Sequence, residues 1–363
     1  MEIFKVNGTT YQGGQIIEGI TKKTWIERYV EPGEFTLIAP VSSDLKSQLP
    51  LGTLISHSDT LELAMVEDHQ ITETKGKDPV IKVTGRTVDF FLENRLAIPN
   101  QFSYNNPATD APYDDILAAA GSYTQAIILI RTHIMAAYQY LNSQENLPNV
   151  NVYYSNAPTE GTFYERRLKK GTVAERLYEI LAFSGLGLKT IRPTYASSTL
   201  DFVVHKGLDR TTSVVFSHLA GDIEEGEYLW SNKKVKNAAI ILGKYTATAI
   251  RPSGPTGFDV RTILVDASDY EVKYDEFSGS INAAIDRALY ARGVEALGMN
   301  KNVEIVSIGI SPNNRYKYRT EYNVGDRVKV AGNYGAVQTM QVTEHVEIED
   351  EDGLTSYPTL SVV

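Results

Sequence analysis

The feature that most constrains this chain is a period-two alternation of apolar and polar residues, carried by short segments near both ends. In the first hundred residues, turn residues such as Gly76-Lys77-Asp78 separate these segments. Alternation of this period puts one set of side chains on each face of a strand, and several short strands with regular turns are typical of a small barrel or sandwich. The predicted strands are Thr24–Val30, Glu34–Pro40, Thr53–Asp59, Leu61–Thr74 and Pro79–Gly85.

The end of the chain repeats the order of this first unit. The segments that start at Gly52 and at Gly325 each begin with glycine and a short alternating strand, followed by a turn and a longer strand. Val66–His69 ("VEDH") and Val342–His345 ("VTEH") then take matching places. Two unrelated β segments would also alternate, so this alternative stays open. A genuine repeat predicts two related β-barrels in one chain.

The middle of the chain has helical periodicity instead. A Pro- and Asn-rich stretch, Ile98–Pro112, marks a boundary, and a helical pattern follows over about Asp114–Asn142. A later helix begins with a capping box formed by Thr172 and Glu175 and ends at Gly185. The apolar face of this helix contains Leu177, Ile180 and Leu181. A hairpin that packs on this helix is expected to follow it.

These patterns predict a β-rich α+β chain with two small β-barrels, the second discontinuous, and two mixed α/β subdomains. An insertion that contains a loop and one helix, Ser280–Gly298, interrupts the second barrel. The predicted parts are an N-terminal β-barrel at 1–97, a mixed helical and β subdomain at 98–205, a second β-barrel at 206–244 and 303–363, and an inserted subdomain at 245–302.

One predicted hairpin of the first unit carries charged residues around its turn. Pro32 and Gly33 lie between its strands and favour a type II turn. Alternation places Trp25, Glu27 and Tyr29 on one strand face, and the other face also mixes apolar and charged residues. We therefore expect an edge hairpin that a neighbouring subunit covers. The candidate subunit-interface residues are Trp25, Arg28, Tyr29, Glu31 and Glu34.

Glu31 and Glu34 also raise the question of a catalytic acid pair. A glycosidase needs one carboxyl group in an apolar pocket that raises its pKa, and a cleft between the two groups. The neighbouring sequence gives no sign of such a pocket. We predict no catalytic residue here.

Composition narrows the possible functions. The chain has 363 residues, no cysteine and a formal net charge of −10. Disulfides, thiolate metal sites and cysteine nucleophiles are excluded, and an acidic surface disfavours tight binding to nucleic-acid phosphates. A channel through which DNA slides stays possible. The N-terminal residues have no signal-peptide pattern, and the most apolar run, Ala126–Tyr138, is too short to cross a bilayer.

Two further motifs have structural interpretations. Ser184–Thr190 ("SGLGLKT") lacks the spacing of a phosphate-binding loop and is typical of the end of a helix. His57 and Asp59 could chelate a metal weakly across one strand face, but a solvated strand pair is favoured. We predict no metal site and no cofactor.

Three charged clusters are also present. The basic segments Glu165–Lys170 and Asn232–Lys236 could contact nucleic acid, although clusters this short are more typical of solvated turns. The acidic segment Glu347–Gly353 does not follow the calcium-loop pattern. It predicts a charged hairpin turn that ends at Asp352-Gly353.

The chain contains, in this order, "WIERYVEPGEFTLIAP", "VTGRTVDFFLENRLAI", "LAFSGLGL", "KGLDRTTSVVFS", "YLWSNKKVKNAAIILG" and "ILVDASD". This series resembles the siphophage tail-tip or baseplate hub family, which includes Gp37-like hubs and the hub domains of tail-associated proteins. The resemblance covers nearly the whole chain and rests on the order of the motifs.

The resemblance implies a structural, non-enzymatic protein of the virion tail tip, assembled in the host cytoplasm. It implies a homotrimer whose two barrels per subunit form a ring of near-sixfold symmetry, between a sixfold tail tube and a threefold tip. The implied partners are a distal tail or tail tube protein, a tape measure protein, a tip or fibre protein, and DNA in transit. Longer members continue into peptidase, lysozyme-like or fibre domains, which we do not expect here.

Two other functions stay open. A receptor- or glycan-binding tail module is compatible with the 22 tyrosines and the β-rich ends. A cell-wall hydrolase would use Glu31 and Glu34.

Overall fold

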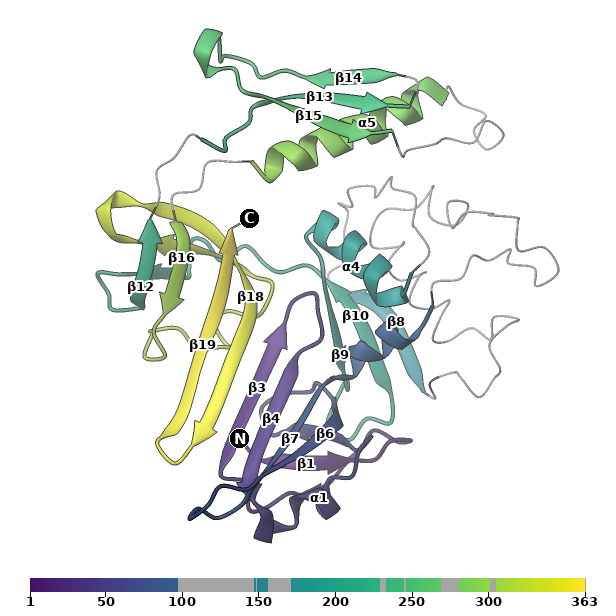
Figure 1. Ribbon diagram of the computed structural model, residues 1–363, viewed down its shortest axis with the longest axis vertical. Helices are drawn as coiled ribbons and strands as arrows, with labels where there is room; N and C mark the ends of the chain where they lie inside the picture. Colours follow the sequence, from purple (N-terminus) through teal and green to yellow (C-terminus); the bar gives the residue numbers. More distant parts are fainter. Residues whose placement is uncertain are drawn as a thin grey trace, which may run out of the picture.

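The computed structural model describes residues 1–96, 147, 149–155, 171–228, 233–244, 246–268, 281–300 and 305–362. Strands dominate these residues and helices are few, which confirms the predicted β-rich class (Figure 1). The helix predicted over Asp114–Asn142 lies outside the described residues. No helix of the described ranges is long and apolar enough to cross a membrane.

The largest sheet has eleven strands and combines both ends of the chain. Its order is β11-β17-β18-β3-β4-β7-β6-β5-β1-β2, and β19 pairs with β18. The pairing of β3 with β18 joins the two halves, which lie side by side in Figure 1. Apart from β19, the strands of this sheet follow one open path from β11 to β2. The strands are β1 (Ile3–Val6), β2 (Gly13–Ile16), β3 (Lys22–Arg28), β4 (Glu34–Pro40), β5 (Leu54–His57), β6 (Ala64–Thr72), β7 (Val80–Thr87), β11 (Val215–Ser217), β17 (Arg327–Ala331), β18 (Val337–Asp350) and β19 (Gly353–Val362).

The two segments of the predicted repeat make matching hydrogen bonds in this sheet. The Gly52 N–H donates to the Val66 carbonyl at 2.8 Å, and the Gly325 N–H donates to the Val342 carbonyl at 2.7 Å. Both glycines have positive φ, 79° and 96°. Strand pairing shifts register immediately after Val66 in β6 and immediately after Val342 in β18. The two β units therefore share local geometry as well as residue pattern.

A second sheet contains β8 (Val150–Ser155), β10 (Leu200–His205) and β9 (Gly187–Ile191), and α4 (Val173–Ser184) packs on it. The predicted capping box of Thr172 and Glu175 is present, with both reciprocal hydrogen bonds. Gly185 ends the helix in the left-handed region, as its sequence predicted. The predicted apolar face is fully buried, and it consists of Leu177, Ile180 and Leu181.

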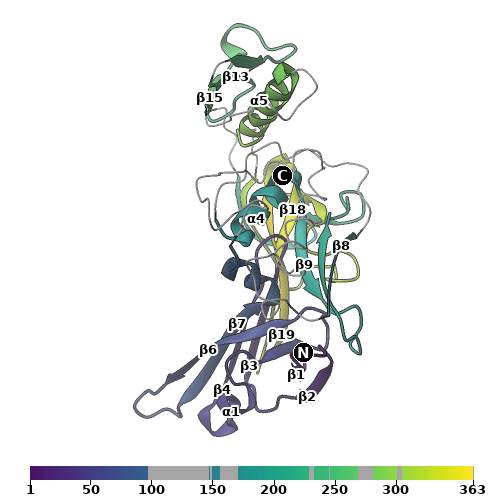
Figure 2. The ribbon, with the colours of Figure 1, turned by 90° about the vertical axis from the view of Figure 1, so that its right-hand side faces the viewer.

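A third, smaller unit contains the sheet β14-β13-β15 and the helix α5 (Ile281–Gly298), at one end of the long axis (Figure 2). Its strands are β13 (Ala238–Gly243), β14 (Ala247–Ile250) and β15 (Thr262–Ala267). The sequence assigned Ala238–Gly243 to the second barrel, and this assignment is wrong. The segment pairs along its whole length with β14 and β15, so the inserted unit begins before residue 245.

The remaining elements are short connections. β12 (Ile223–Tyr228) and β16 (Ile305–Ile310) form a two-stranded sheet. A 3-10 helix, η2 (Val88–Asn94), follows β7. The other short helices are η1 (Val41–Ser43), α1 (Leu45–Gln48), η4 (Gly257–Asp259) and η5 (Asn333–Gly335). The charged turn predicted at Asp352-Gly353 is confirmed, because β18 and β19 form an antiparallel hairpin with Asp350 opposite Gly353.

The hairpin of β3 and β4 differs from its prediction in two respects. It is internal, because β3 also pairs with β18 and β4 also pairs with β7. The predicted type II turn is wrong, since Gly33 is absent from the residues with positive φ. A Cβ atom on Gly33 would lie 2.3 Å from the Ile26 carbonyl oxygen. The chain needs glycine here for close packing rather than for an unusual φ.

Candidate functional site

The inward face of β3, together with Tyr29 directly after it, carries a charged residue between two aromatic ones, as the alternation predicted. Trp25, Glu27 and Tyr29 are all buried. Trp25 belongs to the core of the N-terminal unit, and Tyr29 to the core formed by β17, β18 and their connections. Glu27 therefore lies where the two cores meet, and a buried carboxylate requires partners at that place.

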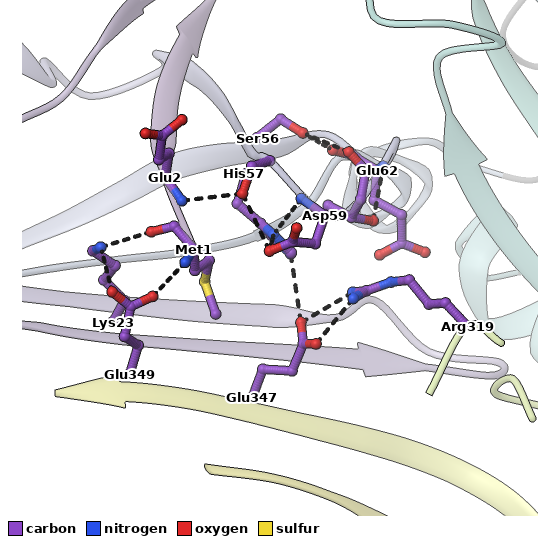
Figure 3. Close-up of polar contacts among 12 residues, drawn as sticks. Met1, Glu2, Lys23, Ser56, His57, Asp59, Glu62, Arg319, Glu347 and Glu349 are labelled. Atoms are coloured by element: carbon purple, nitrogen blue, oxygen red, sulfur yellow. Dashed lines mark hydrogen bonds and ion pairs between the residues drawn. The ribbon is translucent and has the colours of Figure 1, made fainter. Parts of the chain in front are cut away.

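Arg319 connects Glu27 with β18. Its Nη2 lies 2.6 Å from Glu27 Oε1. Figure 3 shows its two terminal nitrogens donating to both carboxylate oxygens of Glu347, at 2.9 and 3.0 Å. Glu27 also accepts hydrogen bonds from Thr60, at 3.1 Å, and from the Tyr318 hydroxyl. We call Glu27, His57, Tyr318, Arg319 and Glu347 the junction cluster.

Opposed electrostatic effects act on the junction cluster. Burial alone would lower the pKa of Arg319, but Glu27 and Glu347 outweigh it and raise that pKa. Burial raises the pKa of Glu347, and Arg319 opposes this. Arg319 also has a positive φ of 62°, a backbone strain that the surrounding contacts must hold in place. One guanidinium thus balances two buried carboxylates.

His57 completes the junction cluster as a neutral ring. It is fully buried, against the Trp25 ring at 4.8 Å, and burial and Arg319 lower its pKa well below the ordinary value. The Asp59 N–H donates to Nδ1 at 3.2 Å, so the ring proton is on Nε2, which lies 3.7 Å from Glu347. The prediction of a solvated His57 and Asp59 pair is wrong for His57. No group of metal-binding side chains is found in the described part of the chain.

A pocket of about 220 Å³ lies beside the junction cluster. Glu27, Glu62 and Tyr318 line it together with residues that follow β10. Burial raises the pKa of Glu62 well above its usual range, and the carboxylates of Glu27 and Asp89 raise it further. The complete lining is Glu27, Arg28, Glu62, Lys189, His205, Lys206, Gly207, Leu208, Tyr318, Asn323, Val324 and Asp326. Three structural units therefore meet at one mixed-charge pocket.

The predicted interface residues divide into two groups. Trp25 and Tyr29 are buried by their own chain. Arg28 donates to Glu34 at 2.7 Å and to Glu344 at 2.9 Å, and so it ties β3 to β4 and to β18. Glu31 is exposed. Contact with a second subunit stays a prediction, and it concerns the accessible side chains of Arg28, Glu31 and Glu34.

Sequence reasoning missed the junction cluster, although one signal was available. Glu27 stands between two aromatic residues on one predicted strand face, a pattern that requires a buried partner. Glu347 was assigned to an exposed acidic tip, but it lies inside β18 and is 8% exposed. Its partner Arg319 lies in an irregular segment, where no periodicity marks it. The basic segment Glu165–Lys170 lies outside the described residues.

Known proteins resemble this chain over its whole length. Residues 1–360 match the family described as Siphovirus ReqiPepy6 Gp37-like protein. The tail protein from Neisseria meningitidis MC58 has a similar structure, with a TM-score of 0.57 and 13% identity. The match covers 99% of this chain and 95% of that protein. No curated protein matches the sequence.

Two further solved structures share the fold over 99% of this chain. The 43 kDa tail protein of prophage MuSo2 from Shewanella oneidensis has a TM-score of 0.58 and 13% identity, with 98% of that protein covered. The prophage tail protein gp18 from Listeria monocytogenes EGD-e has a TM-score of 0.54 and 9% identity, with 94% covered. At such identities the likeness establishes a common fold.

Proposed function

This chain belongs to the Siphovirus ReqiPepy6 Gp37-like family, and from that premise we propose that it is the structural hub of a phage tail tip or baseplate. The family makes it a phage tail protein with a place in the virion tail. The proposed role is structural rather than enzymatic. In this role three copies form a ring that adapts a sixfold tail tube to a threefold tip.

The internal repeat is the observation that carries this proposal. The two β units have matching hydrogen bonds at Gly52 and Gly325. We infer from this match that each chain presents two similar faces. A trimer of such chains presents six similar units to a sixfold tube and three whole chains to a threefold tip. We propose that these two units act as the two barrel-like segments of the ring.

The proposed partners follow from this position. A distal tail or tail tube protein and a tape measure protein would lie on one side of the ring, and a tip or fibre protein on the other. DNA would pass through the centre without stable binding. The formal net charge is −10 per chain, so three chains carry a charge of about −30. Acidic groups at the lumen would repel the phosphates of the DNA as it passes.

The direct test is the mass and symmetry of the purified protein. A ring of three chains has three times the 40.2 kDa mass of one chain, and its two-dimensional class averages show threefold or pseudo-sixfold symmetry. Mass photometry and negative-stain imaging, with and without the phage tail tube protein, measure both. A chain that stays monomeric alone and with its tube protein would contradict the hub role.

The hydrolase alternative has little geometric support. The Glu34 side chain is 48% exposed and paired with Arg28, whereas a general acid requires an apolar pocket. The hydrolase alternative would be reinstated by one result. The chain would have to degrade cell walls, and changing both Glu31 and Glu34 to Gln would have to abolish this activity. Binding of the isolated chain to purified cell walls would instead favour the receptor- or glycan-binding alternative.

A further inference from the structure

Arg192 is a buried cation without a hydrogen-bond acceptor. Its exposure is 0%, and Nε, Nη1 and Nη2 all lack a hydrogen-bond partner in the described structure. Burial lowers its pKa, and Tyr195 opposes this effect. Because arginine keeps its proton in proteins, the charge is still present. An uncompensated buried guanidinium is costly and marks a place where an anion would be stabilised.

Two aromatic rings cover the faces of this guanidinium. The Arg192 Cζ atom lies 5.3 Å from the ring centroid of Phe4 and 5.3 Å from that of Tyr195. Contacts of this kind stabilise a cation through the ring faces, but they leave the N–H groups at the edge of the guanidinium plane unused. Those edge groups are the ones that bind a planar or tetrahedral oxyanion with two parallel hydrogen bonds.

Gly13 lies beside Nη1 and places no side chain on that side of the guanidinium. A Cβ atom at this position would lie 3.6 Å from Arg192 Nη1 and 3.2 Å from the Phe4 ring. Gly13 has no positive φ, so glycine is not required there by the backbone. It belongs to β2, which ends the strand path of the largest sheet and is exposed at all four residues.

Tyr195 closes the site from the outside. Its side chain is 46% exposed, and its hydroxyl donates to the Ser58 carbonyl at 2.6 Å. This hydrogen bond and an edge contact with the Phe4 ring hold the Tyr195 ring over Arg192.

We propose that Arg192 is the anchor of an oxyanion site between β2 and Tyr195, which accepts a phosphate or carboxylate group when the Tyr195 ring moves aside. The ligand oxygens would accept from Nη1 and a second guanidinium N–H over the gap at Gly13. This site is independent of the proposed hub function.

The test uses the full chain and two simple probes, sodium phosphate and sodium acetate, each at about 10 mM against sodium chloride of equal ionic strength. A bound probe raises the melting temperature by about 2 °C. Phosphate alone, acetate alone or both can give this rise, and the pattern identifies the oxyanion class. No rise with either probe overturns the proposal.

Four variants establish where the probe binds. Arg192→Met and Gly13→Ala each remove the rise, the first by loss of the cation and the second by filling the gap. Gly8→Ala is the matched control, because a Cβ atom there meets nothing within 4 Å, and it keeps the rise. Tyr195→Phe loses the bond to Ser58 and binds the probe at least as tightly. If the probe still raises the melting temperature of Gly13→Ala, the proposed site is overturned. This result decides the question even if Arg192→Met fails to fold.

Discussion

At the scale of single residues, Arg319 holds the most consequential contacts. The Arg319→Met change would leave Glu27 and Glu347 buried without their cation, at a cost of about 3–5 kcal/mol in unfolding free energy. Arg327→Met is the matched control, since Arg327 and Asp209 form an exposed pair at 3.4 Å whose loss costs about 0–1 kcal/mol. Urea unfolding of both variants measures the difference. Equal losses would show that the junction cluster contributes no more than a surface pair.

Asp89 makes stability depend on pH. It is 3% exposed, and burial raises its pKa from 3.8 to about 7. Between these values the folded chain keeps a proton that the unfolded chain has released, so stability falls as pH rises. The unfolding free energy of the wild type should lose about 4 kcal/mol relative to Asp89→Asn between pH 4 and pH 8. Unfolding curves of both proteins at several pH values measure this, and a constant difference would refute it.

At the scale of elements, Gly33 shows how close packing fixes the β3 and β4 hairpin. The Gly33→Ala change would force a Cβ atom against the Ile26 carbonyl, 2.3 Å away, and should destabilise the fold by about 1–3 kcal/mol. Gly8→Ala has open space around it and should change stability by less than about 0.5 kcal/mol. Thermal unfolding measures the stability of both variants. An equally stable Gly33→Ala variant would mean that the hairpin shifts easily.

The elements also show how much the sequence could predict. α4 was predicted correctly in its cap, apolar face and end, because these signals lie within a few residues of one another. The neighbour of β3 could not be predicted, since Arg28 and its partner Glu344 are 316 residues apart. β14 and β15 were missed inside the insertion, where short strands next to a Pro- and Gly-rich loop resemble loop sequence. Local signals thus predicted elements, whereas the junction cluster depends on distant pairing.

At the scale of the whole molecule, the subunit contact is the prediction that still requires a test. Arg28→Glu would place a third carboxylate beside Glu34 and Glu344, so it should destabilise the monomer as well as any assembly. Glu31→Lys separates assembly from folding better, because Glu31 is exposed. It should reduce the trimer fraction at least tenfold while the melting temperature of the monomer stays within about 1 °C.

The control for this variant is Lys77→Glu, an exposed charge reversal at the turn between β6 and β7. It should leave assembly unchanged. Mass photometry at several protein concentrations measures the trimer fraction of each variant. Unchanged assembly of Glu31→Lys would move the subunit contact away from this hairpin.

The pairing of β3 with β18 also has a consequence for biosynthesis. β3 leaves the ribosome early, but its partner strand is made about 316 residues later, which at 5–20 residues per second is a delay of about 15–60 s. During this interval the edge of β3 that β18 will occupy is open, together with the carboxylate of Glu27. A nascent chain in this state is open to wrong strand pairing and to chaperone binding. The pairing of β3 is complete only when the hairpin of β18 and β19 has been translated.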